Sequence, residues 1–310
     1  MKRMRLVLLL LLVMFTHGCH PAPQRVDGTS RRRETVATSN APAPAWSAET
    51  AESTRFGLGR GPSQNTAPSS ADSIVEERAT APALKPLVAP AHLVALEVPG
   101  FLDAIVAVPL GTTSPRPVVL ALHGNFDRPE WQCDVMREIT EAYPFVLCPR
   151  GIRRRDVPAS MDRWEYGSVK ALQKEIDSGL TALHARFQRY VAEGPIVFTG
   201  FSLGAILGRP IVTGAAARYP RVLFTEGGAQ GWDWARFKAG GGERVLFACA
   251  QAGCAPGARS VAKQAARYGV DVHVADGGKV GHTYDGPVAR AIQAEWAWLV
   301  EGDERWRVQR

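Results

Sequence analysis

The stretch Gly200–Gly204, GFSLG, places Ser202 between two glycines directly after an apolar run. A serine needs small residues two positions before and after it where a strand turns sharply into a helix, because larger side chains would collide. In that setting the hydroxyl projects at a helix N-terminus, whose dipole favours an oxyanion. The pattern therefore predicts that Ser202 is a nucleophile, and a serine in a purely structural turn is the alternative.

A nucleophilic serine needs a general base. Two histidines follow Ser202 in the chain. His273 lies within VDVHV, which is typical of a strand, whereas His282 lies in the glycine-rich stretch GKVGHTYDG. A loop after the last strand can bring an imidazole to the nucleophile, so we predict that His282 is the base.

The oxyanion that forms during attack needs hydrogen-bond donors. Leu203 follows the serine and supplies the first candidate, its backbone N–H. The second is expected after PVVLALHG, where Gly124 lets the chain bend and the N–H of Asn125 or Phe126 follows. The neighbouring His123 is expected to be structural.

The carboxylate that would orient His282 is less evident. Residues 250–254, which follow the apolar run RVLFAC, contain no Asp or Glu. Glu226 ends another apolar run, LFTEGG, and is favoured as the acid, with Asp276 and Asp233 as alternatives. A serine–histidine pair without an acid remains open, because loss of the acid slows such enzymes without abolishing catalysis.

Together, LHG, GFSLG and VGHTY resemble the α/β-hydrolase superfamily over about residues 117–301, in particular its small lidless esterases, carboxylesterases and dienelactone hydrolases. The resemblance implies an acyl-enzyme mechanism on small-molecule esters, with no cofactor and no metal. The family usually places its acid in the loop after RVLFAC, so this chain departs from the family there. A peptidase or amidase, and a catalytically inactive domain that serves as a surface binding module, are the alternative functions.

Apolar runs alternate with amphipathic stretches along the chain. Strands are predicted near residues 92–100, 104–112, 117–124, 145–151, 196–200, 221–228, 244–250 and 270–278. Helices are predicted near 130–142, 169–190, 258–269 and 288–301, with another beginning at 203. This alternation predicts a doubly wound, mostly parallel α/β sheet flanked by helices, without a large lid. Trp164, Tyr166 and Trp232 follow strand ends and are candidates for the walls of a substrate pocket.

The first ninety residues differ from the rest. Residues 1–19 combine a basic start, the apolar run Leu6–Phe15 and Cys19, which predicts a signal peptide with a lipobox and lipidation of Cys19. Ordinary secretion with cleavage nearby is the alternative. Residues 20–90 are rich in Ala, Pro and Ser and are predicted to be a disordered tether. The hydrolase domain is then expected at 91–303, followed by a charged tail at 304–310, and the protein is expected to be an exported bacterial lipoprotein anchored in a membrane.

The net charge of the chain is +7. Residues 1–90 carry 11 Lys and Arg against 7 Asp and Glu, and residues 91–310 carry 26 against 23, so the predicted domain has no strongly basic field and no nucleic-acid partner is expected. Besides Cys19, the cysteines are Cys133, Cys148, Cys249 and Cys254. An even number in an exported chain permits disulfides, and short loops favour the pairs 133–148 and 249–254. Four buried thiols are the alternative.

Overall fold

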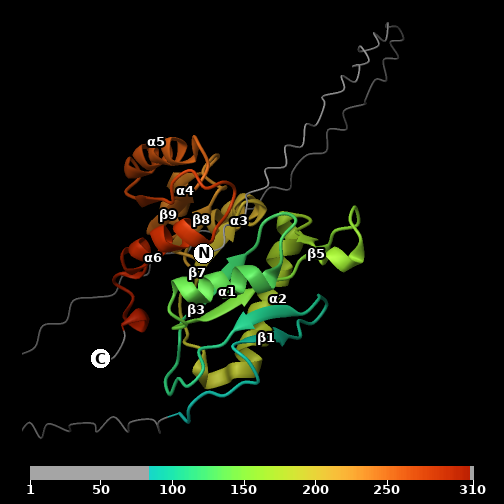
Figure 1. Cartoon of the computed structure of the whole chain (residues 1–310). Helices are drawn as coiled ribbons and strands as arrows, with labels where there is room; N and C mark the ends of the chain where they lie inside the picture. The colour runs from blue at the N-terminus through green and yellow to red at the C-terminus, as the bar shows by residue number, and fades with distance from the viewer. Residues whose placement is uncertain (1–83, 308–310) are drawn as a thin grey trace, which may run out of the picture. The chain divides into compact units, whose positions relative to one another are not determined.

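The computed structural model describes residues 84–307. The predicted signal peptide, Cys19 and most of the predicted tether lie outside the described residues. Eight strands form one sheet in the order β1-β2-β4-β3-β7-β8-β9-β10 (Figure 1). These strands are β1 (Leu93–Leu96), β2 (Ala104–Ala107), β3 (Val118–Leu122), β4 (Phe145–Cys148), β7 (Val197–Phe201), β8 (Arg221–Thr225), β9 (Arg244–Cys249) and β10 (Asp271–Asp276).

The sheet is mostly parallel. β1 pairs with β2, and β2 with β4, in antiparallel fashion, while all other neighbouring strands of this sheet run parallel. Strands β3, β7 and β8 are buried at every position, as expected for strands covered on both faces. The predicted fold class, a doubly wound, mostly parallel α/β sheet flanked by helices, is confirmed.

Helices cover both faces of the sheet. They are α1 (Pro129–Ile139), α2 (Val169–Phe187), α3 (Leu203–Gly214), α4 (Trp234–Ala239), α5 (Cys254–Ala266) and α6 (Gly286–Val300). Helices α2 to α5 pack on one face with strand residues such as Leu120, and α1 and α6 pack on the other with Val119. Successive side chains of a strand point to opposite faces, so each parallel strand contributes to both cores.

Three local elements differ from the sequence prediction. Helix α5 begins at Cys254 rather than near residue 258. Pro256 therefore lies in its first turn, where proline is tolerated. The short helix α4 and the hairpin of β5 (Ile152–Arg153) and β6 (Trp164–Glu165) were not predicted. Strands of two residues are too short to show an alternating pattern.

The boundaries of the folded part are also wider than predicted. Leu87, assigned to the tether, is buried, and its N–H donates to the carbonyl of Thr112. Residues 304–306, assigned to the charged tail, form a 3₁₀ turn. The side chain of Arg305 in that turn donates to the carbonyls of Glu193 and Pro195. Apolar burial at one end and hydrogen bonds at the other extend the domain beyond 91–303.

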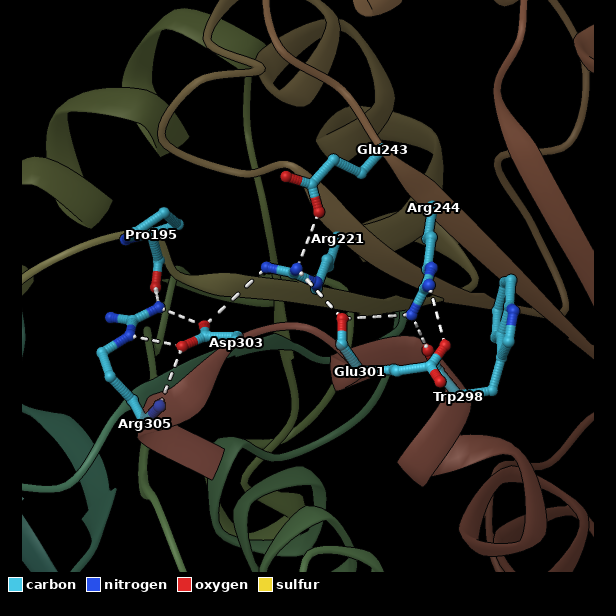
Figure 2. A network of polar contacts seen from close by, with 8 residues as sticks. All are labelled: Pro195, Arg221, Glu243, Arg244, Trp298, Glu301, Asp303 and Arg305. Atoms are coloured by element: carbon cyan, nitrogen blue, oxygen red, sulfur yellow. Dashed lines mark hydrogen bonds and ion pairs between the residues drawn. The ribbon is translucent and has the colours of Figure 1, made fainter. Parts of the chain in front are cut away.

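The C-terminal segment is held by a network of charged residues at the start of β8 and β9 (Figure 2). Arg221, the first residue of β8, lies 2.7 Å from Glu243 and 3.8 Å from Asp303. Arg244, the first residue of β9, lies 2.9 Å from the carboxylate of Glu301. This network stands at the amino ends of the parallel strands, at the edge of the sheet opposite Ser202.

The four cysteines of the domain form two disulfides, Cys133–Cys148 and Cys249–Cys254, which are the pairs that the short loops favour. The first joins α1 to the end of β4, and the second joins the end of β9 to the start of α5. Among residues 84–307, no helix combines the length and apolar character needed to span a bilayer.

Candidate active site

Ser202 lies in a sharp turn between β7 and α3. Its φ of +50° is in the left-handed region, which a residue other than glycine rarely adopts. The flanking glycines are required by space: a Cβ at Gly200 would lie 2.8 Å from the backbone of Ala205, and one at Gly204 would lie 2.7 Å from the carbonyl of His123. Ser202 N–H donates to the carbonyl of Thr225, which fixes the turn against β8. The structure therefore has the strand–turn–helix geometry that the sequence predicts.

His282 reaches this serine from the loop between β10 and α6. Its Nε2 lies 2.8 Å from the Oγ of Ser202. The imidazole packs on the ring of Phe201 at 4.8 Å between centroids, and its side chain is 42% exposed. A base that is hydrogen-bonded to the hydroxyl and open to solvent can accept the serine proton and exchange it with a substrate.

Glu226 is the third residue of a row that runs from Ser202 through His282. Its Oε2 lies 3.4 Å from Nδ1 of His282, longer than an ordinary hydrogen bond, and open sites often tighten when substrate binds. The other carboxylate oxygen accepts the N–H groups of Ala250 and Gln251. The Glu226 side chain is 2% exposed, so a buried carboxylate faces the imidazole from a fixed position.

The loop at residues 250–253 thus takes part without supplying an acid. Its two N–H groups hold Glu226, while the carbonyl of Ala250 accepts the N–H groups of Val280 and Gly281, directly before His282. The Cys249–Cys254 disulfide closes this loop at both ends. One short loop therefore positions both partners of the imidazole.

The other candidate acids lie elsewhere. Asp276 pairs with Arg259 at 3.2 Å and accepts the N–H of Gly278. Asp233 caps α4 by accepting the N–H of Arg236. Of the three predicted candidates, the structure brings only Glu226 to His282.

The predicted oxyanion donors separate into two cases. Leu203 is the first residue of α3, where N–H groups have no partner within the helix. The N–H of Asn125 likewise has no acceptor among the described residues. The N–H of Phe126, by contrast, donates to the carbonyl of Trp164 at 3.0 Å. Because that bond pairs the loop with β6, Phe126 is not a free donor, and Asn125 is the better candidate.

Two predicted pocket residues are structural supports instead. Tyr166 is buried, stacks on His123 at 4.4 Å, accepts the N–H of His123 and donates to the carbonyl of Pro149. Trp164 is buried beneath the guanidinium groups of Arg150 and Arg153. Their aromatic area is already used in packing, which a position after a strand end does not reveal.

His123 is completely buried, with one ring nitrogen near each of the carbonyls of Gly124 and Arg150. Burial lowers the pKa of this imidazole, although the two carbonyl contacts oppose the shift. Through these contacts His123 supports the loop at residues 124–126, and it is shielded from solvent. This agrees with the expected structural role.

Sequence reasoning missed Asp127, which joins the two loops around the site. Its carboxylate accepts the N–H of Gly124 in the oxyanion loop and the hydroxyl of Tyr284, two residues after His282. Tyr284 also packs edge-on against Phe201 at 4.6 Å. Burial and the charge of Asp127 raise the pKa of Tyr284, so its hydroxyl remains a donor. A single aspartate before a helix gives no sequence signal of such a link.

Two cavities adjoin this row of residues. One, of about 520 Å³, is bordered by His282 and by the side chains of Phe126, Trp131 and Tyr284. The other, of about 500 Å³, begins at Glu226 and Gly227 and extends between α3 and α5. The predicted wall residue Trp232 lines neither, because it stacks flat on Trp234 at 4.3 Å and donates to the carbonyl of Gly228. Phe126 and Trp131, which are partly exposed, provide the aromatic wall instead.

No family model and no curated protein matches the sequence. Among solved structures, the S-formylglutathione hydrolase from Agrobacterium tumefaciens is 14% identical, with a TM-score of 0.49, and the match covers 71% of this chain and 98% of that one. The Bacillus cereus carboxylesterase is 15% identical, with a TM-score of 0.45, over 64% and 94% of the two chains. A ferulic acid esterase from Anaeromyces mucronatus is 13% identical, with a TM-score of 0.46, over 73% and 93%.

With TM-scores below 0.5, these likenesses carry no information on fold or substrate. The sheet order and the turn at Ser202, observed directly, agree with the α/β-hydrolase fold that the sequence resemblance implies.

Proposed function

We propose that this protein is a serine hydrolase that cleaves carboxylic esters, with Ser202 as nucleophile, His282 as general base and Glu226 as the orienting acid. The observation that supports it most strongly is the continuous row from Ser202 Oγ through His282 to the buried Glu226 carboxylate, with separations of 2.8 and 3.4 Å. This supports catalysis over the inactive binding module, whose motivation was the absence of an acid from the loop at residues 250–254.

In the proposed mechanism, Nε2 of His282 takes the proton of Ser202 as Oγ attacks the ester carbonyl carbon. The N–H groups of Leu203 and Asn125 stabilise the oxyanion. The carbon–oxygen bond to the alcohol then breaks, and His282 returns the proton to the leaving alcohol oxygen. Water, activated by His282, hydrolyses the acyl-enzyme and releases the acid, which restores Ser202.

The test is covalent labelling combined with kinetics. A fluorophosphonate should label Ser202 in the wild-type protein, and Ser202→Ala should lose labelling and at least about a thousandfold of the activity on p-nitrophenyl acetate. Full esterase activity in Ser202→Ala would refute the proposal. Comparing matched ester and anilide substrates separates an esterase from an amidase, because faster anilide cleavage would favour the amidase.

We also propose that the chain is exported and anchored through a lipid on Cys19. The N-terminal sequence pattern supports this, as do two disulfides in the domain, because such bonds persist in oxidising compartments. Cys19→Ala should move the protein from the membrane to the soluble fraction of a bacterial host. A membrane-bound Cys19→Ala variant would contradict the anchor.

A further inference from the structure

The cavity between α3 and α5 is lined mainly by apolar and small residues, with four polar side chains among them: Arg209, Glu226, Gln230 and Gln251. Its floor is formed by Phe224 of β8 and Phe247 of β9. Ile206 of α3, 52% exposed, forms one wall, and Gly257 and Ala258 of α5 form the other. At about 500 Å³, it lies within the size range of small-molecule sites. Apart from Glu226 at its inner end, the proposed mechanism uses none of the residues that line this cavity.

The inner end of the groove reaches the backbone of the turn that carries the nucleophile, and Ser202 itself is not among the residues that line it. Gly227 lines the groove, and a Cβ on it would lie 2.7 Å from the carbonyl oxygen of Ser202. Ile206 lies one helical turn below the serine, and its N–H donates to that same carbonyl. The groove therefore begins beside the backbone of the turn that carries Ser202.

Gly257 lines the groove on the side of α5. It lies within α5, where glycine is less favourable than alanine. Its φ is not in the left-handed region, and a Cβ built on it meets no atom within 4 Å. Neither backbone conformation nor packing therefore requires glycine here. A side chain at this position would occupy the open space beside the groove.

The proposed roles of Ser202 and His282 indicate whether the groove would bind the acyl part or the alcohol part of the ester. His282 returns its proton to the leaving alcohol, so the alcohol must lie on the side of His282, which borders the other cavity. The acyl chain then extends away from His282, past Gly227. We propose that the groove between α3 and α5 is an acyl-chain subsite and that the substrates are esters of medium-length, apolar carboxylic acids. This inference rests on the proposed function.

The experiment uses the full chain and p-nitrophenyl esters from acetate to octanoate. In the wild type, kcat/KM should rise about fourfold for each methylene that the groove buries. Gly257→Leu should lower the ratio of kcat/KM for octanoate to that for acetate at least tenfold. Ala266→Leu, which adds the same side chain at an exposed position of α5 outside the groove, should leave this ratio unchanged.

Two further variants guard against a folding artefact. Gly257→Ala should raise the Tm by about 2 °C, because alanine favours the helix and the space is open. Ile206→Trp narrows the groove from the opposite wall and should lower the same ratio if Gly257→Leu does not fold.

The outcomes separate the two proposals. An unchanged octanoate-to-acetate ratio in folded Gly257→Leu or Ile206→Trp would overturn the subsite while leaving Ser202-dependent acetate hydrolysis intact. Octyl acetate, whose long chain is in the alcohol, is tested alongside. If Gly257→Leu lowers the hydrolysis of octyl acetate rather than of p-nitrophenyl octanoate, the groove binds the alcohol and the acyl assignment is overturned. Absence of all ester hydrolysis in the wild type would instead refute the proposed function.

Discussion

At the scale of single residues, Glu226 combines a rare backbone conformation with a buried, doubly held carboxylate. Its φ is +53°, and Gly227 and Gly228 follow it. A Cβ at Gly228 would lie 2.6 Å from the ring of Phe224, so the chain after Glu226 can turn back closely only with glycine there. This local geometry directs the carboxylate toward Ala250 and His282.

Replacing this carboxylate should separate it from the other candidate acids. Glu226→Gln should lower kcat for p-nitrophenyl acetate at least about a hundredfold, because the amide cannot orient and stabilise the imidazolium as a carboxylate does. Asp276→Asn and Asp233→Asn should stay within about threefold of the wild type. A large loss in either of these, with Glu226→Gln active, would move the role of the acid to that residue.

Asp127 should act through position, since it contacts the two loops rather than Ser202 or His282. Asp127→Asn weakens its bonds to Gly124 and Tyr284 at once, and kcat for p-nitrophenyl acetate should fall about tenfold with KM little changed. Tyr284→Phe removes only one bond and should cost less. Equal losses in the two variants would show that the bond to Gly124 is unimportant.

The predicted site residues that the structure brings together differ in how strong a local signature they carry. Ser202 stood between glycines after an apolar run, and His282 was one of two histidines after it. Glu226 was one of three acids, because the side-chain direction depends on a left-handed φ that sequence does not encode. Asp127 gave no signal, because its partners Gly124 and Tyr284 meet only in the folded chain.

At the scale of elements, the parallel strands were predicted well because each is a continuous apolar run. The hairpin β5–β6 was missed, yet β6 accepts the N–H of Phe126 and so decides which backbone group faces the site. Pairing across distant segments depends on tertiary contact rather than on local pattern. The same reason explains why Trp164 and Tyr166 were expected in a pocket.

Removal of either disulfide should lower stability, and the two should rank in opposite order for their effects on stability and on activity. Loop-closure entropy predicts a loss of about 2 kcal/mol without Cys249–Cys254 and about 3 kcal/mol without Cys133–Cys148, which closes the longer loop. Only the Cys249–Cys254 disulfide closes the loop that holds Glu226. The double variant Cys249→Ala, Cys254→Ala should therefore lose about tenfold in kcat/KM. Its Tm should nevertheless be higher than that of a variant without the Cys133–Cys148 disulfide.

The double variant Cys133→Ala, Cys148→Ala is the matched control, with a lower Tm and nearly normal kinetics at a temperature where it is folded. Thermal unfolding and p-nitrophenyl acetate kinetics on both variants measure the two effects. If the ranking of activity followed the ranking of stability, the loop would have no positioning role.

At the scale of the whole molecule, the charged network of Figure 2 should make stability depend on pH. Burial would raise the pKa of Asp303, but hydrogen bonds from Arg305 and the charges of Arg305 and Arg221 outweigh it, so the pKa is lowered. A lowered pKa in the folded state stabilises the protein above the unfolded value of about 3.9, and this contribution disappears as the pH falls through the folded pKa.

Asp303→Asn should therefore destabilise the domain by about 2 kcal/mol at pH 7, because charge-assisted hydrogen bonds are lost. The difference in Tm from the wild type should shrink as the pH falls below about 4. Thermal unfolding between pH 3 and pH 8 measures this. A Tm difference that is constant across that range would show that the Asp303 charge contributes nothing.

The Cys249–Cys254 bond would also make the activity depend on the oxidation state of the chain. Cys249 is the last, buried residue of β9 and Cys254 is the first residue of α5, so the two sulfurs meet where the sheet joins the helix. A chain kept among free thiols would already carry Ser202 and His282, but its third partner would be loosely held. Under the proposed function, the chain would hydrolyse esters about ten times more slowly before this bond forms.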